Sequence, residues 1–272
     1  MFVRAVLVFL TVPAFSFTAT PPSPEALLQH GLHFADLYNW SDARSDFEAA
    51  EKEFAAIGDT RDVLYAHLGL IRASIEQHNL PRTSAELSSE LERNPLLASD
   101  KQLRMFCLII KGDIDQEIDT RAARLDWQKV EMLAQRFGDA HWRNRAMGQI
   151  GIAAFYDRDL ETASKNVATA AAVAAKIHDI GAQIRFTTVL GMGLVQAKMY
   201  DRALPYFDKA LELTKNAPDS GYPFFTYEAQ LEALIGLQRY DDAQRLADDM
   251  LKQIAPSTGR VHRRNFFLSQ LE

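Results

Sequence analysis

The stretch LGMGLVQAKMYDRALPYFDKALELTKNAPD, residues 190–219, holds two amphipathic runs separated by a short break at residues 198–201. The first run carries Gly191, and the second carries Ala203 and Ala210. These small residues allow two helices to approach closely. Three larger side chains are available to fill the seam around that contact: Leu194, Tyr200 and Phe207. The stretch therefore predicts a pair of packed antiparallel helices.

The same pattern recurs along the chain with a period of 40 residues. The position of the first small residue is occupied in turn by Gly31, Ile71, Lys111, Gly151, Gly191 and Leu231. Twelve residues later come Ala43, Thr83, Ala123, Ala163, Ala203 and Ala243, and four residues after those come Phe47, Leu87, Trp127, Val167, Phe207 and Ala247. The break between the helices falls at Trp40, Leu80, Thr120, Leu160, Tyr200 and Tyr240. A phase kept through six units predicts six stacked helical hairpins.

Composition agrees with an all-α protein. Ala, Leu, Glu, Lys, Gln and Arg fill the periodic segments, and no segment shows the sustained alternation of a strand. The chain is 47% hydrophobic and 24% charged, which suits a buried core beneath a soluble surface. A net charge of −6 argues against non-specific binding of nucleic acid. The single cysteine, Cys107, excludes an intrachain disulfide.

The combination of small and aromatic residues on paired helices resembles the tetratricopeptide repeat (TPR) family. The resemblance covers about residues 23–257 and implies a right-handed superhelical solenoid of stacked antiparallel helix hairpins. The unit here is longer than the common repeat of about 34 residues. Longer units of this kind are similar to those of bacterial regulatory and sensor proteins. Arrays of this family mostly bind partners, so the resemblance implies a scaffold and leaves the partner open.

The two ends of the chain lie outside the six units. Arg4 and the apolar run of residues 5–15 are typical of a secretory signal, with cleavage expected after Ser16 or Ala19. We therefore assign residues 1–19 to a signal peptide and residues 20–257 to the hairpins, and expect a periplasmic or secreted protein without an integral membrane span after cleavage. The alternative is a cytoplasmic protein whose first hydrophobic helix is not cleaved. Residues 258–272 are expected to form the first helix of a seventh unit or a C-terminal cap, through which the protein could self-associate.

No pattern in the sequence points to catalysis or to a cofactor. There is no nucleophile elbow, phosphate loop or cluster with metal-ligand spacing. His30 and His33 lie three residues apart on one helix, but spacing suggests no third ligand, so packing or rim positions are favoured over a metal site. Cys107 lies at a packing phase and is expected to be a buried thiol rather than a nucleophile. We expect no enzymatic activity.

The concave face of the superhelix is the expected binding site. In the TPR arrangement that the resemblance implies, the first helices of the hairpins line this face, and the phases beside the small residue point inward. They predict a mixed basic and aromatic surface at units four and five: Arg145, Arg185, Phe155, Tyr156 and Gln196. Arg145 and Arg185 are candidates to receive a ligand carboxylate. The alternative is that both arginines pair with acids of the neighbouring unit.

Two functional classes follow from these observations. The first is a non-catalytic scaffold that holds a peptide or protein partner in its concave groove. The second is the N-terminal sensor or regulatory arm of a longer protein with a C-terminal output domain. A reading frame that continues past residue 272 into non-repeat sequence would favour the second class.

Overall fold

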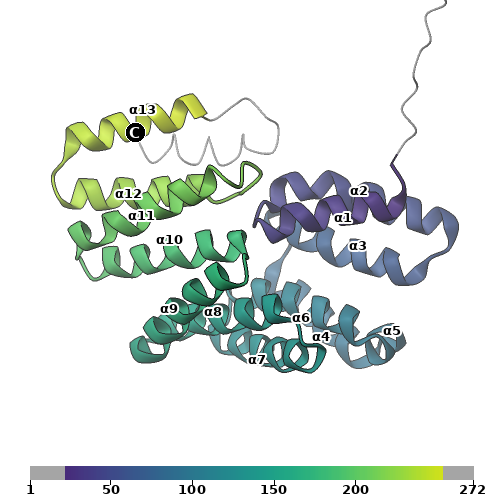
Figure 1. Cartoon of the computed structure of the whole chain (residues 1–272). Coiled ribbons are helices and arrows are strands. Elements are labelled where there is room, and N and C mark those ends of the chain that lie inside the picture. The colour runs from purple at the N-terminus through teal and green to yellow at the C-terminus, as the bar shows by residue number, and fades with distance from the viewer. Residues whose placement is uncertain (1–21, 254–272) are drawn as a thin grey trace, which may run out of the picture.

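A computed structural model describes residues 22–253 of the chain (Figure 1). The expected signal peptide and the expected seventh unit, residues 1–19 and 258–272, lie outside the described residues. Within residues 22–253 the regular structure is entirely helical. None of the described helices is both long and apolar enough to cross a lipid bilayer.

The helices form six antiparallel hairpins. The first three pair α1 (Pro24–Asp36) with α2 (Trp40–Ile57), α3 (Thr60–Ala73) with α4 (Leu80–Arg93), and α6 (Lys101–Asp115) with α7 (Thr120–Phe137). The last three pair α8 (Ala140–Tyr156) with α9 (Leu160–Lys176), α10 (Ile180–Gln196) with α11 (Tyr200–Thr214), and α12 (Pro223–Gly236) with α13 (Tyr240–Gln253). Two short helices interrupt the second unit: the 3-10 helix η1 (Ile75–Gln77) and α5 (Pro95–Ser99). The expectation of an all-α solenoid of stacked hairpins is confirmed, since each hairpin packs mainly on its neighbours along the chain.

The 40-residue period is visible in the helix boundaries. The second helix of each hairpin begins at residue 40, 80, 120, 160, 200 or 240. In the first four hairpins the residue immediately before is Asn39, Asn79, Asp119 or Asp159, and its side chain accepts a hydrogen bond from the first turn. Such caps stabilise a helix because its first backbone N–H groups lack partners within it. In α2 this cap is Asn39 and not Ser41 or Asp42, although their side chains also carry oxygens that could accept such a hydrogen bond.

The small positions lie opposite the large side chains that the sequence assigns to the seam. A Cβ atom added to Gly191 would lie 2.5 Å from the ring of Phe207, which is fully buried. Phe47 is held in the same way between Gly31 and Gly69, where an added Cβ would lie 3.1 and 2.6 Å from its ring. Gly31 and Gly191 therefore set how closely the two helices of a hairpin approach, and Gly69 sets how closely α3 of the second hairpin approaches α2 of the first.

The third hairpin has a charged residue at the position that a small residue occupies in the first and fifth hairpins. Lys111 occupies the position of the small residue and is only 8% exposed. Its ammonium binds the carboxylates of Asp115 and Asp126, both almost fully buried, and Asp126 also accepts a hydrogen bond from Lys129 at 2.8 Å. A buried ammonium needs such partners because transfer from water is costly.

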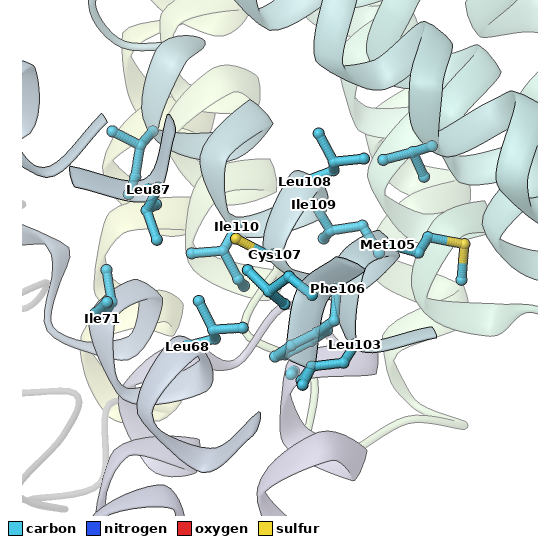
Figure 2. Close-up of a cluster of buried hydrophobic side chains, with 14 of the residues drawn as sticks. Leu68, Ile71, Leu87, Leu103, Met105, Phe106, Cys107, Leu108, Ile109 and Ile110 are labelled. Carbon is cyan, nitrogen blue, oxygen red and sulfur yellow. The ribbon is translucent and has the colours of Figure 1, made fainter. Parts of the chain in front are cut away.

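The largest hydrophobic cluster surrounds α6 (Figure 2). This helix is buried on almost every side because it packs on α3, α4 and α7. Cys107 is fully buried there, and burial raises the pKa of its thiol to about 12. A thiol with so high a pKa stays protonated at neutral pH, which agrees with the expected packing role.

Candidate ligand-binding groove

A groove of about 1190 Å³ lies on the concave face of the solenoid. Its walls come mainly from first helices, as the resemblance implies: α3, α6, α8, α10 and α12. The turn before α2 and the start of this helix form one side of the groove, with Tyr38, Trp40 and Ser41. A groove of this size can hold several side chains of a bound segment.

Large apolar side chains line the groove and remain accessible. Tyr156, at the end of α8, is 61% exposed, and Met192 of α10 and Phe225 of α12 are each 40% exposed. Ile118, in the turn before α7, is 41% exposed. Accessible apolar surface gathered in a concavity favours association with another apolar surface.

The groove has more acidic than basic side chains. Its lining includes five carboxylates, from Glu76, Asp113, Glu117, Asp119 and Glu228, and three arginines, Arg72, Arg121 and Arg185. Two of the arginines are already engaged. Arg72 donates to Asp113 at 2.7 Å and lies over the ring of Trp40 at 5.2 Å, and Arg185 is held as described below. Several carboxylates are engaged as well: Asp113 by Arg72, Asp119 as the cap of α7, and Glu76 at 3.9 Å from Arg44. Five carboxylates and three guanidiniums give the lining a net charge of −2.

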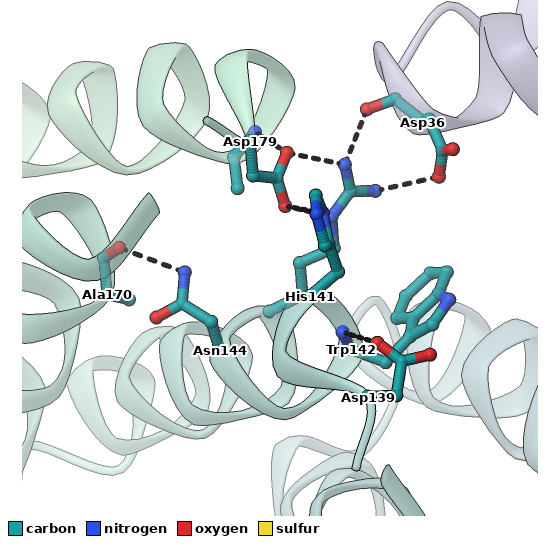
Figure 3. A network of polar contacts seen from close by, with 9 residues as sticks. Asp36, Asp139, His141, Trp142, Asn144, Ala170 and Asp179 are labelled. Atoms are coloured by element: carbon teal, nitrogen blue, oxygen red, sulfur yellow. Dashed lines mark hydrogen bonds and ion pairs between the residues drawn. The ribbon is translucent and has the colours of Figure 1, made fainter. Parts of the chain in front are cut away.

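Arg145 is buried beside the groove, at 4% exposure, and all three nitrogens of its guanidinium donate hydrogen bonds (Figure 3). Nε and Nη2 bind the carboxylate of Asp179 at 2.8 and 2.7 Å. Nη1 binds a carboxylate oxygen of Asp36 at 3.2 Å, and Nη2 also binds the backbone oxygen of Asp36 at 2.9 Å. The bidentate contact to Asp179 joins neighbouring hairpins, whereas the contacts to Asp36 join hairpins four and one.

The charge balance of this network follows from its burial. Burial acts to lower the pKa of the Arg145 guanidinium, but Tyr38, Asp179 and Asp36 raise it above its ordinary value. Burial likewise acts to raise the pKa of the Asp179 carboxyl, but the hydrogen bonds and charge of Arg145 hold it below its ordinary value. Both groups are therefore charged at neutral pH.

Arg185 is enclosed by aromatic rings. Its guanidinium lies 4.7 Å from the ring centre of Tyr38 and 5.9 Å from that of Tyr222. It donates to the hydroxyl of Tyr222 at 2.8 Å and to the side-chain oxygen of Gln149 at 2.9 Å. Cation–π contacts of this kind hold the guanidinium plane against the rings.

The first hairpin therefore touches hairpins four, five and six directly. The turn between α1 and α2 reaches across the concave side, where its backbone oxygen at Leu37 accepts a hydrogen bond from the N–H of Gly221 at 3.1 Å. Asn39 donates to the backbone oxygen of Asp219 at 2.9 Å. A small apolar cluster seals this contact, formed by Leu37, Tyr38, Ile180, Ile184, Leu213, Ala217 and Tyr222.

The five predicted binding residues occupy different surroundings. Arg185 and Tyr156 line the groove. Phe155 is half-buried and packs its ring against Tyr156 at 5.8 Å, and Gln196 is exposed at the end of α10 outside the groove lining. Arg145 forms an ion pair with Asp179 of the neighbouring hairpin. This is the alternative that the sequence left open for the two arginines. Whether any of the five binds a partner stays a prediction.

The repeat period points to two further residues of the groove. Phe225 has the repeat phase of Arg145 and Arg185, and Met192 follows the small residue Gly191 directly. Periodicity could have identified both as inward-facing. Tyr38 carries no such signal, because it lies in a turn and reaches the groove only through the contact between distant hairpins.

His30 and His33 do not share a metal site. His30 contacts Asp46 at 2.8 Å and His33 contacts Asp219 at 3.4 Å, so the two rings have separate partners. Among residues 22–253 no group of three or more potential ligands is placed to hold a metal ion.

Comparison with known proteins supports the fold. No family model and no curated protein matches this chain. Among solved structures, the chain is similar to a Rap protein crystallised in complex with Competence and Sporulation Factor, with a TM-score of 0.60. The two sequences are 15% identical over 91% of this chain and 73% of the other. At this identity the likeness concerns the fold alone, and it defines the chain as a helical-repeat protein.

Proposed function

We propose that this chain is a non-catalytic scaffold of the TPR class that binds an extended segment of a peptide or protein partner in the concave groove. The observation that carries the proposal is the groove itself, because it combines accessible apolar side chains with a net negative charge. The similar Rap protein is described in complex with Competence and Sporulation Factor, which supports a binding role for this fold.

The lining suggests the chemistry of the bound segment. Apolar side chains of a partner would cover Tyr156, Met192 and Phe225, which are accessible in the free protein. A basic side chain would lie near Glu117, which is exposed at the rim between α6 and α7. A carboxylate ligand is disfavoured at Arg145, because its guanidinium already binds Asp179 and Asp36, whereas Arg185 donates to the neutral side chains of Tyr222 and Gln149. We therefore expect a segment with apolar residues and a net positive charge.

A matched pair of variants tests this site. Met192→Lys places an ammonium in the groove, where it removes an apolar contact and repels a positively charged segment, whereas Met132→Lys makes the same change at a similarly exposed position of α7 outside the groove. Peptides are first selected from a random display library on the unmodified protein, and their affinity for each variant is then measured by fluorescence anisotropy. We expect Met192→Lys to weaken binding by about tenfold or more and Met132→Lys to leave it unchanged.

Three results would count against the proposal. The library could yield no binder, the selected peptides could be rich in Asp and Glu, or both methionine variants could bind equally well. The first would remove the binding function, the second the assigned charge and the third the assigned site.

We also propose that the chain is exported and that its leader is removed, on the basis of the apolar run of residues 5–15 after Arg4. N-terminal sequencing of the protein recovered from its native host would test this. A mature chain beginning near residue 17 or 20 is expected, and a chain retaining residues 1–16 would refute export by cleavage.

A further inference from the structure

The contact between the first hairpin and hairpins four to six is additional to the repeat architecture. In a solenoid each unit is stabilised by its immediate neighbours. Here Arg145 and Asp36 are separated by 109 residues, and Asn39 and Asp219 by 180 residues. We refer to this contact as the clasp: residues 36–39 on one side, and Arg145, Gly181 and residues 219–222 on the other.

The clasp brings backbone against backbone. A Cβ atom added to Gly181 would lie 2.2 Å from the backbone oxygen of Asp36, and one added to Gly221 would lie 2.4 Å from that of Tyr38. Neither oxygen belongs to a flexible side chain that could turn away. Any side chain at either glycine therefore requires the two sides of the clasp to separate.

The clasp and the groove share residues. Tyr38 comes from one side of the clasp and Tyr222 from the other, and both line the groove. Arg185, which lies over both rings, lines it as well. The wall of the groove near α10 and α12 is therefore complete only while the clasp is closed.

We infer that the clasp regulates the groove: the closed form binds the partner segment, and separation of the turn at residues 37–39 from hairpins four to six lets the segment enter and leave. A ligand that touches residues from both sides gains affinity only in the closed form, so binding and closure are thermodynamically linked. This inference rests on the groove being the binding site, as proposed above.

The composition of the clasp suits a reversible contact. It consists of the ion pair between Arg145 and Asp36, three hydrogen bonds to the backbone oxygens of residues 36, 37 and 219, and the small apolar cluster around Ile184. The packed interiors of the hairpins do not depend on it, because each is buried against its neighbours along the chain. Opening can therefore leave the hairpins folded.

The test uses two glycine-to-alanine substitutions in the same helix. Gly181→Ala introduces a methyl group against the backbone of the first hairpin, whereas Gly193→Ala introduces one where no atom lies within 4 Å. Both lie in α10, where alanine is a better helix former than glycine, so neither change should unfold the helix. Gly221→Ala, in the loop before α12, serves as a second opening variant.

Two measurements report on the clasp without any ligand. The N–H of Gly221, which donates to Leu37, should exchange with deuterium faster in Gly181→Ala than in Gly193→Ala. The radius of gyration from small-angle X-ray scattering should increase in Gly181→Ala and Gly221→Ala but not in Gly193→Ala. Unchanged circular dichroism would show that the hairpins remain folded.

The third measurement is the affinity for a library-selected peptide. If the closed form falls to about a tenth of the population, the apparent affinity should fall about tenfold in Gly181→Ala and stay unchanged in Gly193→Ala. Peptide binding should also slow the exchange of the Gly221 amide in the unmodified protein.

The outcomes separate this inference from the proposed function. Equal peptide affinity in an opened Gly181→Ala protein and in Gly193→Ala would overturn the regulation and leave the binding function intact. A clasp that stays closed in both Gly181→Ala and Gly221→Ala would overturn the inference as well. Failure of every peptide to bind the unmodified protein would remove the proposed function, whatever the scattering and exchange data show.

Discussion

The packing of Phe207 against Gly191 leads to a quantitative prediction about the repeat. Phe207 is fully buried, and an added Cβ at position 191 would lie 2.5 Å from its ring. Gly191→Ala should therefore gain up to about 1 kcal/mol in helix propensity but lose about 1–3 kcal/mol through overpacking. Phe207→Ala should cost about 3–5 kcal/mol through lost burial and the cavity left behind.

The double variant isolates the contact. Without the ring, the methyl group at position 191 meets no obstacle and partly fills the cavity, so only its helix-propensity gain remains. The double variant should then be more stable than the sum of the two single changes predicts, by about 1–3 kcal/mol. Gly193→Ala, whose methyl group would meet nothing within 4 Å, should be additive with Phe207→Ala to within about 0.5 kcal/mol.

Urea denaturation followed by circular dichroism measures these free energies of unfolding. The comparison is valid where the dependence on urea concentration is the same for all variants, because a changed slope indicates loss of a single cooperative transition. Additivity of Gly191→Ala and Phe207→Ala would refute the explanation that glycine is required here by the ring of the second helix.

Three further predictions concern stability. Lys111→Ala should cost about 3–5 kcal/mol in urea denaturation because it leaves buried Asp115 without its cation and Asp126 with Lys129 alone, whereas Lys129→Ala, at a more exposed ammonium, should cost at most about 1 kcal/mol. The lowered pKa of Asp179 stabilises the fold above its unfolded-state pKa and is lost as pH falls, so acid titration between about pH 5 and about pH 2 should destabilise Asp179→Asn less than the unmodified protein. Gly138, whose φ is 71°, should lose about 1–2 kcal/mol as alanine, measured by thermal unfolding, and no loss would contradict the left-handed turn.

Much of the fold could be predicted from the sequence because its determinants are local. The 40-residue phase locates the start of every second helix, and the pairing of Gly191 with Phe207 follows from residues sixteen apart in one hairpin. Asp59, Asp139 and Asp179 each cap the helix that follows, since an aspartate before a helix can accept hydrogen bonds from its free N–H groups. The sequence does not distinguish Asn39 as the cap of α2, because the side chains of Ser41 and Asp42 close by also carry an oxygen that can accept a hydrogen bond.

The candidate site was predicted only in part. Arg185 and Tyr156, which the inward phase selects, both line the groove, because the side-chain direction along a helix follows from its periodicity. That phase gave no information about the partners of Arg145, which depend on where the first hairpin lies relative to the fourth.

The sequence by itself determined the hairpins, their spacing and the residues that pack within each of them. These features depend on contacts between residues close in the chain, which a repeat period records. Only the tertiary structure decided that the turn at residues 37–39 closes against hairpins four to six and that Tyr38 becomes a wall of the groove. That contact depends on the rotation from each hairpin to the next, accumulated over several units, and a small change at each step moves the distant turn by a large distance.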